Sequence, residues 1–492
     1  MSNLSMPTFT DEFSLLKFAH SILTYNFPQD DLKKAFLLVL YENMIRMGIV
    51  FDLHSEFAEI VFNGNIPNHT SDIDIDNAVK LLMKKYKTSK ESFSPRITYK
   101  YLMLLALAYI LKLGDIRYDA PRFANLYTRL KINKKQQFLL ENYIRILETG
   151  NVPELLSFFK DTDLYKSAVT IQPLNVFINN EYNFYNLPRR NISVFSTMSA
   201  GKSTFINSLL GHDYLPSKNE ACTAKIASIA NTGYIDYCLG YASMKGKPVF
   251  CGNVDQKKME EWNNDHEVSR IILEGNLDRI SSEKTVTIIH DTPGINYSGN
   301  AEHKKITIDH LINSKPEVII CLLDATQMFT TDSSEALEDL KIANESIKAR
   351  ILFVLNKADS YDAKKESLNE TIADTLAAFT EKGFSSPAII PVSSRAARLF
   401  KMALHERINF TENEIDDFVH YLRFFSRPEN DFSRLAASVP DEIHRNNEYK
   451  ASGKNEITVE GKKYEREQIT QALFKTGIPV IENLLNTQTE AA

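Results

Sequence analysis

Residues 191–204 read Asn-Ile-Ser-Val-Phe-Ser-Thr-Met-Ser-Ala-Gly-Lys-Ser-Thr. An apolar, β-branched run comes first, a loop of small residues follows it, and an amphipathic segment over 205–210 continues from the loop. This order predicts a strand, a phosphate-binding loop and a helix. The backbone N–H groups of such a loop form an anion-binding concavity, and the helix N-terminus adds its positive dipole end. The stretch therefore predicts an α/β domain built around a phosphate site.

Within this loop, individual residue types suit different parts of a phosphorylated ligand. Lys202 can reach the β- and γ-phosphates, and the Ser203 hydroxyl can ligate Mg²⁺. Ser196 stands where the pattern G-x-x-x-x-G-K-[ST] has its first glycine, so a plain small-residue turn is the alternative. We expect the loop as a whole to contact the nucleotide through Thr197, Met198, Ser199, Ala200, Gly201, Lys202, Ser203 and Thr204.

A second motif, Asp-Thr-Pro-Gly at 291–294, directly follows the apolar run 286–289. In phosphate-loop proteins an Asp at the end of a neighbouring strand holds Mg²⁺. Asp291 is the candidate for this role, and Gly294 would let a backbone N–H approach the γ-phosphate. A Pro-Gly turn that merely ends a strand is the alternative interpretation.

A third motif, Asn-Lys-Ala-Asp at 356–359, follows the apolar run 351–355. The Asp359 carboxylate can accept two hydrogen bonds from adjacent N–H donors, which guanine offers and adenine does not. The Lys357 stem can cover the face of the base, and Asn356 can tie the segment to the phosphate loop. One strand beyond the 291–294 motif, this short pattern indicates GTP rather than ATP.

Two further candidates complete the set. Thr223 lies between the first helix and the second predicted strand, where a hydroxyl could join the Mg²⁺ shell only when a γ-phosphate is present. It could also simply begin a strand. Ser393 and Ser394 follow the apolar run 388–390 and could contact the base through their backbone, or could merely cap the next helix.

Apolar periodicity predicts the wider organisation of the chain. Helical spacing before about residue 185 predicts an all-α helical domain over 1–170 and a connector over 171–189. Alternating strands and helices then predict a P-loop GTPase domain with a mainly parallel sheet over 190–404. Residues 405–470 read as an irregular insertion, and 471–492 as the closing helix and tail. The predicted strands are 191–195, 224–230, 234–241, 285–290, 317–323, 350–355 and 387–392, and the predicted helices are 202–210, 255–279, 302–313, 333–346, 364–382 and 394–403.

Composition narrows the function class. The 492 residues carry a net charge of −6, which argues against a nucleic-acid partner bound by bulk charge. The four cysteines have no metal-ligand spacing, so a reducing, cytoplasmic compartment is expected. No signal peptide is recognised, and the most apolar helical run, 101–111, is shorter than the roughly 20 residues that span a bilayer. We expect no integral membrane segment.

Together these motifs resemble the dynamin-like GTPase family, in its bacterial branch. The resemblance rests on 196–204, on Leu-Gly-His-Asp-Tyr-Leu-Pro at 210–216, on Thr223, and on the motifs at 291–294 and 356–359. It covers about 190–400 and the closing helix near 477–485. The family usually has a C-terminal helical stalk, which this sequence lacks, so only the N-terminal helices could serve as one. No basic amphipathic helix is evident, and peripheral membrane contact is implied by the resemblance alone.

The resemblance also implies details of catalysis. It assigns catalytic roles to Ser199, Lys202 and Thr223, and metal ligation to Ser203, Thr223 and Asp291. In the family, the residue at the Ser199 position helps bind a monovalent cation, K⁺ or Na⁺, and orient the attacking water. The acidic residue corresponding to Asp362 supports that cation, and no catalytic glutamine follows the Asp-x-x-Gly motif, where this chain has Ile295. Dimerisation across the nucleotide face, as a homodimer or with a companion dynamin-like protein, usually stimulates hydrolysis.

The expected function is Mg²⁺-dependent hydrolysis of GTP to GDP and phosphate. Two alternatives share the same motifs. One is a nucleotide-gated interaction module with little hydrolysis, and the other is a GTPase of the ribosome-assembly type. The acidic net charge and the lack of a recognisable RNA-binding domain count against the latter.

Overall fold

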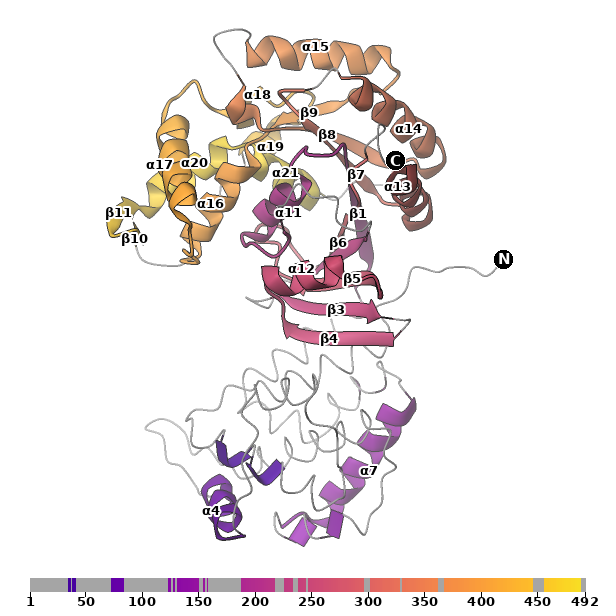
Figure 1. Ribbon diagram of the computed structural model, residues 1–492, viewed down its shortest axis with the longest axis vertical. Helices are drawn as coiled ribbons and strands as arrows, with labels where there is room; N and C mark the ends of the chain where they lie inside the picture. The colour runs from indigo at the N-terminus through magenta and orange to yellow at the C-terminus, as the bar shows by residue number, and fades with distance from the viewer. Residues whose placement is uncertain are drawn as a thin grey trace. The chain divides into compact units, whose positions relative to one another are not determined.

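Among the residues that the structure describes, nine strands form one sheet in the order β4-β3-β5-β2-β6-β1-β7-β8-β9 (Figure 1). The strands are β1 (Arg189–Ser196), β2 (Ala227–Asn231), β3 (Leu239–Met244), β4 (Lys247–Asn253), β5 (Val268–Gly275), β6 (Val286–Asp291), β7 (Val318–Asp324), β8 (Arg350–Asn356) and β9 (Ala388–Pro391). Strand β1 pairs in parallel with both β6 and β7, and the pairs β7–β8, β8–β9 and β2–β5 are also parallel. The pairs β2–β6 and β3–β5 are antiparallel. The sheet is therefore mixed and mostly parallel, as the sequence predicts.

The computed structural model describes residues 187–216, 225–232, 238–244, 247–295, 301–327, 330–361, 367–445 and 455–487, with shorter stretches between 34 and 157. The chain divides into two compact units, of which one holds 1–6, 187–249 and 253–492 and the other holds 7–186 and 250–252. In the second unit the described elements include helices α4 (Asp72–Met83) and α7 (Lys134–Thr149). Most of the predicted helical domain and the connector up to residue 186 lie outside the described residues, so the domain boundaries stay predictions.

Continuous apolar runs form the central strands because helices cover both faces of the sheet. In β7, residues 318–323 are all buried. Figure 1 shows α13 (Ala301–Ser314) and α14 (Thr331–Ile347) on one side of the central strands, and α11 (Lys202–Leu210), α16 (Ser394–Leu404) and α21 (Ile478–Asn486) on the other. Helix α15 (Leu368–Glu381) packs near β9.

Helix α11 follows directly from the chemistry of its sequence. Its apolar side chains, including Phe205 and Leu209, recur at helical spacing and are completely buried. The helix ends where Gly211 adopts a left-handed φ of 62° and its N–H bonds to the Asn207 carbonyl. The Asn207 side chain then holds the turn that follows, because its amide bonds to both the N–H and the carbonyl of Leu215.

The prediction of one helix over 255–279 is wrong. Helix α12 (Gln256–Asn264) ends after about two turns, and strand β5 follows it. Residues 271–273 of β5 are buried, and a short apolar run of this kind does not by itself distinguish a strand from a buried helix. Strand β4 was not expected either, and the predicted strand at 234–241 begins later, as β3.

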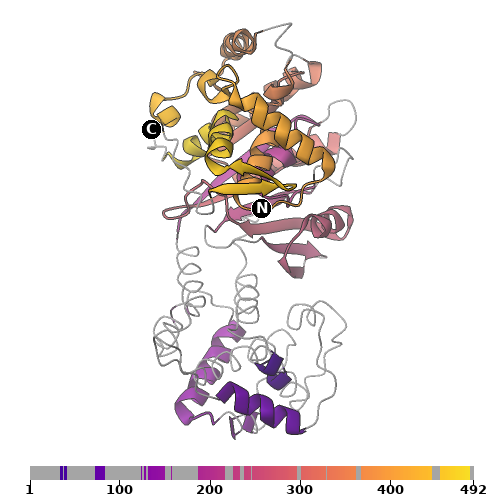
Figure 2. The ribbon, with the colours of Figure 1, turned by 90° about the vertical axis from the view of Figure 1, so that its left-hand side faces the viewer.

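The expectation of irregular structure over 405–470 is also wrong. This region contains α17 (Glu412–Ser426), α18 (Phe432–Leu435), α19 (Asp441–Arg445), the antiparallel hairpin of β10 (Glu456–Val459) and β11 (Lys462–Glu465), and the first half of α20 (Arg466–Lys475). Helix α17 packs against α16 and α20. Figure 2 views the molecule from this side, with α17 and the hairpin turned toward the reader.

Candidate nucleotide-binding site

The three sequence motifs lie at one edge of the sheet. Strands β1, β6 and β8 end at 196, 291 and 356, and the segments 197–201, 292–295 and 357–359 follow them. Parallel strands bring their carboxyl ends to the same edge, and ligands of open α/β sheets bind there. The topology therefore gathers the predicted site residues from separate parts of the sequence.

The loop after β1 is joined to the segment after β6 by backbone hydrogen bonds. The Met198 N–H donates to the Ile295 carbonyl, and the Ile295 N–H donates to the Ser196 carbonyl, each at 3.0 Å. The Thr292 hydroxyl adds a 2.7 Å bond to the Val194 carbonyl. These contacts hold the entry of the loop, where Ser196 replaces the usual glycine, against the 291–294 motif.

Gly201 is required by the geometry of the loop. Its φ is +86°, and a Cβ placed on it would lie 2.5 Å from the Asn356 amide nitrogen. Both the left-handed backbone and the close approach exclude a larger side chain. Ser199, two residues earlier, also has a positive φ of 62° and is exposed.

Lys202 at the start of α11 forms an ion pair with Asp291, and the two side chains are only 13% and 15% exposed. The phosphate-binding candidate and the Mg²⁺-binding candidate are thus direct neighbours. Ser203, in the same first helical turn, is half-buried. Thr204 lines an open cavity of about 1110 Å³ together with His212, Asp213 and residues of α16.

The 356–359 motif is tied to the loop by side chains. The Asn356 amide donates to the Ala200 carbonyl at 2.8 Å, which is the tie that the sequence leads us to expect. Its oxygen accepts a 3.3 Å bond from the Ser394 N–H. The Lys357 ammonium donates to the Ser199 carbonyl and to Asp324, each at 2.7 Å.

Asp324 is a site neighbour that sequence reasoning missed. It ends β7, directly after a buried apolar run, and this position was the available signal. Burial acts to raise the pKa of Asp324, but hydrogen bonds from Lys357 and Thr326 more than offset it and lower the pKa below its ordinary value. Asp324 therefore stays ionised and fixes the Lys357 side chain beside the loop.

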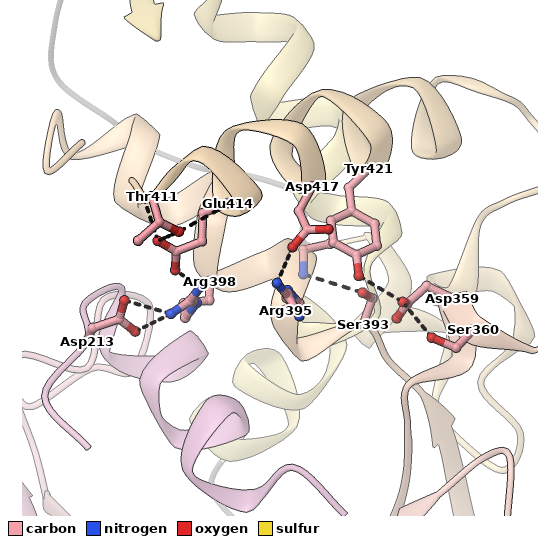
Figure 3. A network of polar contacts seen from close by, with 11 residues as sticks. Asp213, Asp359, Ser360, Ser393, Arg395, Arg398, Thr411, Glu414, Asp417 and Tyr421 are labelled. Carbon is pink, nitrogen blue, oxygen red and sulfur yellow. Dashed lines mark hydrogen bonds and ion pairs between the residues drawn. The ribbon is translucent and has the colours of Figure 1, made fainter. Parts of the chain in front are cut away.

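Asp359 lies in a single 3₁₀ turn, Ala358–Ser360. One of its oxygens, Oδ2, accepts hydrogen bonds from the Ser360 hydroxyl at 3.3 Å and from the Tyr421 hydroxyl at 3.1 Å. Figure 3 shows Tyr421 reaching Asp359 from α17. Sequence reasoning also missed Tyr421, and the stretch around it carries only an amphipathic helical pattern as a signal.

The remaining predicted residues are either buried at the start of α16 or lie outside the described residues. Ser393 is fully buried, and its hydroxyl caps α16 by accepting from the Ala396 N–H at 3.4 Å. Ser394 is 1% exposed. Ser393 thus has the capping role that was its alternative, and a backbone contact of Ser393 or Ser394 with the base stays a prediction. Thr223 and Asp362 lie outside the described residues, and their roles stay predictions.

The described residues fit Mg²⁺ in the way that nucleotide sites usually hold it. Among the parts of the chain described, no group of three or more His, Cys, Asp or Glu side chains is placed to hold a metal ion by itself. Mg²⁺ in nucleotide sites is typically held by one or two protein oxygens together with phosphate oxygens and water. Ser203 and Asp291 can supply such oxygens. Within the described ranges, no helix is both long and apolar enough to cross a bilayer.

Comparison with known proteins finds one family model that matches most of these motifs. Residues 192–358 match the model of the dynamin family. The chain is 21% identical over 366 residues to the clamp-binding protein CrfC of Escherichia coli, an alignment that covers 59% of this chain and 47% of CrfC. The chain thus spans about half the length of this curated relative.

Two solved structures show weaker similarity. An oligomerised bacterial dynamin pair, described as a mechanism for the long-range sensing and tethering of membranes, is 17% identical, with 88% of this chain and 60% of that chain covered and a TM-score of 0.35. Era in complex with MgGDPNP and 16S ribosomal RNA nucleotides is 17% identical, with 42% of this chain and 52% of that chain covered and a TM-score of 0.26. The family match spans the phosphate loop and the 291–294 motif and ends at residue 358. Over residues 192–358 the chain is therefore similar to the dynamin family.

Proposed function

We propose that this chain binds GTP with Mg²⁺ and hydrolyses it to GDP and phosphate. The observation that carries the proposal is the meeting of three distant segments in one place. Lys202 contacts Asp291, and Asn356 contacts Ala200 from 156 residues away. A triphosphate, a divalent ion and a base need donors and acceptors from all three segments.

Each side chain has a definite task in this proposal. The γ-phosphate replaces Asp291 as the partner of Lys202, which leaves the Asp291 carboxylate free to join Ser203 in holding Mg²⁺. When bound, Mg²⁺ neutralises charge on the phosphate oxygens. Asp359 accepts hydrogen bonds from the guanine edge, and Lys357 covers its face. Ser199 and Thr223 complete the catalytic set, with Asp362 and Ser199 supporting K⁺ or Na⁺.

Catalysis of this kind depends on position and electrostatics rather than on a covalent intermediate. Ile295, which follows the 291–294 motif, is 1% exposed and paired with the loop, so it offers no polar group to an attacking water. We propose that a second subunit, either another copy or a companion dynamin-like protein, completes the site. Peripheral membrane contact is proposed from the family relationship.

The buried Ile295 also favours a second candidate, a nucleotide-gated interaction module with little hydrolysis. Single-turnover GTP hydrolysis, measured over a range of protein concentrations in K⁺ and in Na⁺, separates the two. A rate that rises with protein concentration supports the dimerising GTPase. A negligible rate under every condition, with GTP bound, supports the module.

Nucleotide binding itself is tested by Lys202→Ala, measured with a fluorescent GTP analogue and Mg²⁺. We expect loss of detectable binding, because Lys202 is the only described lysine placed at the start of α11. Lys304→Ala is the matched control, since Lys304 lies on α13, is 40% exposed and pairs with Asp339. Unchanged GTP affinity in Lys202→Ala would reject the proposal.

A further inference from the structure

One face of helix α17 contacts the rest of the domain through three polar side chains. Glu414, Asp417 and Tyr421 are spaced by three and four residues, so they lie on the same side of the helix. They contact Arg398, Arg395 and Asp359 respectively (Figure 3). The last of these partners is the carboxylate proposed to recognise guanine.

The position of α17 is determined by more than the tyrosine. Thr411 and Glu414 form a capping box at its N-terminus. Arg398 bridges Glu414 and Asp213, and it lies 2.6 and 2.7 Å from the two Asp213 oxygens. Phe418 is completely buried, and its ring lies 5.4 Å from that of Tyr464 on β11. The helix therefore brings the Tyr421 hydroxyl to a defined place.

Tyr421 is built as a hydrogen-bond donor. Its side chain is buried, with 8% exposed, and the hydroxyl donates to Asp359 Oδ2 at 3.1 Å. Burial and the neighbouring Asp359 charge raise the pKa of Tyr421, so the phenol keeps its proton throughout the neutral range. The Ser360 hydroxyl donates to the same oxygen at 3.3 Å.

This arrangement leaves Asp359 able to accept further hydrogen bonds. Each carboxylate oxygen has about two acceptor sites. The two hydroxyls occupy both sites of Oδ2, whereas Oδ1 accepts no hydrogen bond from the described residues. The terminal torsion of an aspartate is broad, and a carboxylate without such anchors rotates readily. Guanine recognition requires the carboxylate plane to match two adjacent donors, N1–H and the 2-amino group.

We propose that Tyr421 is a positioning residue for base selectivity: it sets the rotation of the Asp359 carboxylate and so favours a base with two adjacent donors. On guanine binding, the carboxylate presents Oδ1, whose acceptor sites are open, to the two adjacent donors, while the Tyr421 and Ser360 hydroxyls keep Oδ2 in place. This inference rests on the proposed function, because it assumes that Asp359 faces the guanine edge.

The test compares GDP with inosine diphosphate, which lacks the 2-amino group, in the wild type and in Tyr421→Phe. We expect GDP binding to weaken about tenfold, the scale of a lost hydrogen bond to a charged group. Inosine diphosphate should lose less, because a freely rotating carboxylate can still meet a single donor. The ratio of the two affinities should therefore fall, which a general loosening of the helix would not produce.

Two variants control the interpretation. Tyr464→Phe removes a hydroxyl from another ring that packs on α17 and should leave the ratio unchanged. Ser360→Ala removes the exposed second anchor and should lower the ratio in the same direction, which keeps the test available if Tyr421→Phe does not fold. An unchanged ratio in both anchor variants, or tighter GDP binding in Tyr421→Phe, would overturn the inference. If Asp359→Asn also left GDP affinity unchanged, the proposed function itself would fail.

Discussion

At the phosphate end of the site, the loop is held mainly by backbone hydrogen bonds, whereas the base end is held by side chains. Met198 and Ile295 pair through their main chains, and the resulting contacts do not depend on side-chain identity. At the base end, Asp359 is anchored by Tyr421, a side chain 62 residues further along the chain. The phosphate end can therefore be recognised from a short motif, and the base end only in part.

The difference also predicts how substitutions at each end affect nucleotide binding. Changes to the phosphate loop act on backbone geometry and should remove binding altogether. Changes around Asp359 should alter which base is bound while phosphate contacts persist. Gly201 lies where the two ends meet, because the Asn356 amide packs directly against it.

After the loss of binding expected for Lys202→Ala, the largest effect is expected for Gly201→Ala. The added Cβ would strain the left-handed backbone by about 1–3 kcal/mol. It would also lie 2.5 Å from the Asn356 amide nitrogen, so the Asn356 side chain would have to move. We expect GTP affinity to fall at least about 100-fold, since a clash of this kind disturbs both the loop and its tie to the base end. Calorimetric titration and thermal unfolding measure the two consequences.

Gly461→Ala is the matched control for this change. Gly461 also has a positive φ, +74°, but a Cβ there would meet nothing within 4 Å. We expect the Gly461→Ala variant to be somewhat less stable than the wild type and to bind the nucleotide with unchanged affinity. Equal nucleotide affinities in the two glycine variants would show that the contact between Gly201 and Asn356 does not matter for binding.

A smaller, more selective effect is expected for Asp359→Asn. The amide replaces an acceptor of the carboxylate with an N–H donor, which opposes the guanine 2-amino group but suits the C2 carbonyl of xanthine. GDP binding should weaken by about tenfold or more, while xanthosine diphosphate binding improves. Competition titrations with both nucleotides measure this, with Asp309→Asn on the exposed face of α13 as the control. Retained preference for GDP would place base recognition elsewhere.

The smallest effect concerns the pH dependence of stability at α17. Burial acts to raise the pKa of Glu414, but the Thr411 N–H and Arg398 more than offset it and lower the pKa below its ordinary value. A carboxylate with a lowered folded pKa contributes stability above its unfolded pKa and loses it as pH falls through the folded value. The free energy of unfolding should therefore decline below about pH 4.5 more steeply in the wild type than in Glu414→Gln. Denaturant titrations at several pH values test this, and parallel curves would contradict it.

Much of the central sheet and of its packing helices could be predicted from the sequence. Apolar runs such as 318–323 form strands because they are buried on both sides, and the apolar spacing over 202–210 forms a helix. The prediction over 255–279 failed where α12 and β5 adjoin without glycine or proline between them. In 405–470, the capping box of Thr411 and Glu414 was a readable signal for α17 that went unused.

The contacts of the candidate site could also be predicted only in part. The tie between Asn356 and the loop follows from motif spacing, because the two segments follow parallel strands that have only β7 between them. The contact between Tyr421 and Asp359 depends on how α17 packs on α16, and tertiary packing of this kind leaves no local pattern. The same holds for the bridge from Arg398 to Asp213, which are 185 residues apart.

One titration tests the central claim most directly: Mg²⁺ with GDP, compared with Mg²⁺ and ADP, on the unmodified protein. Both ligands carry the same diphosphate, so only the base end distinguishes them. If one pocket joins the loop at 197–203 to Asp359, GDP should bind at least about 100-fold more tightly than ADP. Equal affinities, or no binding of either nucleotide, would contradict the account.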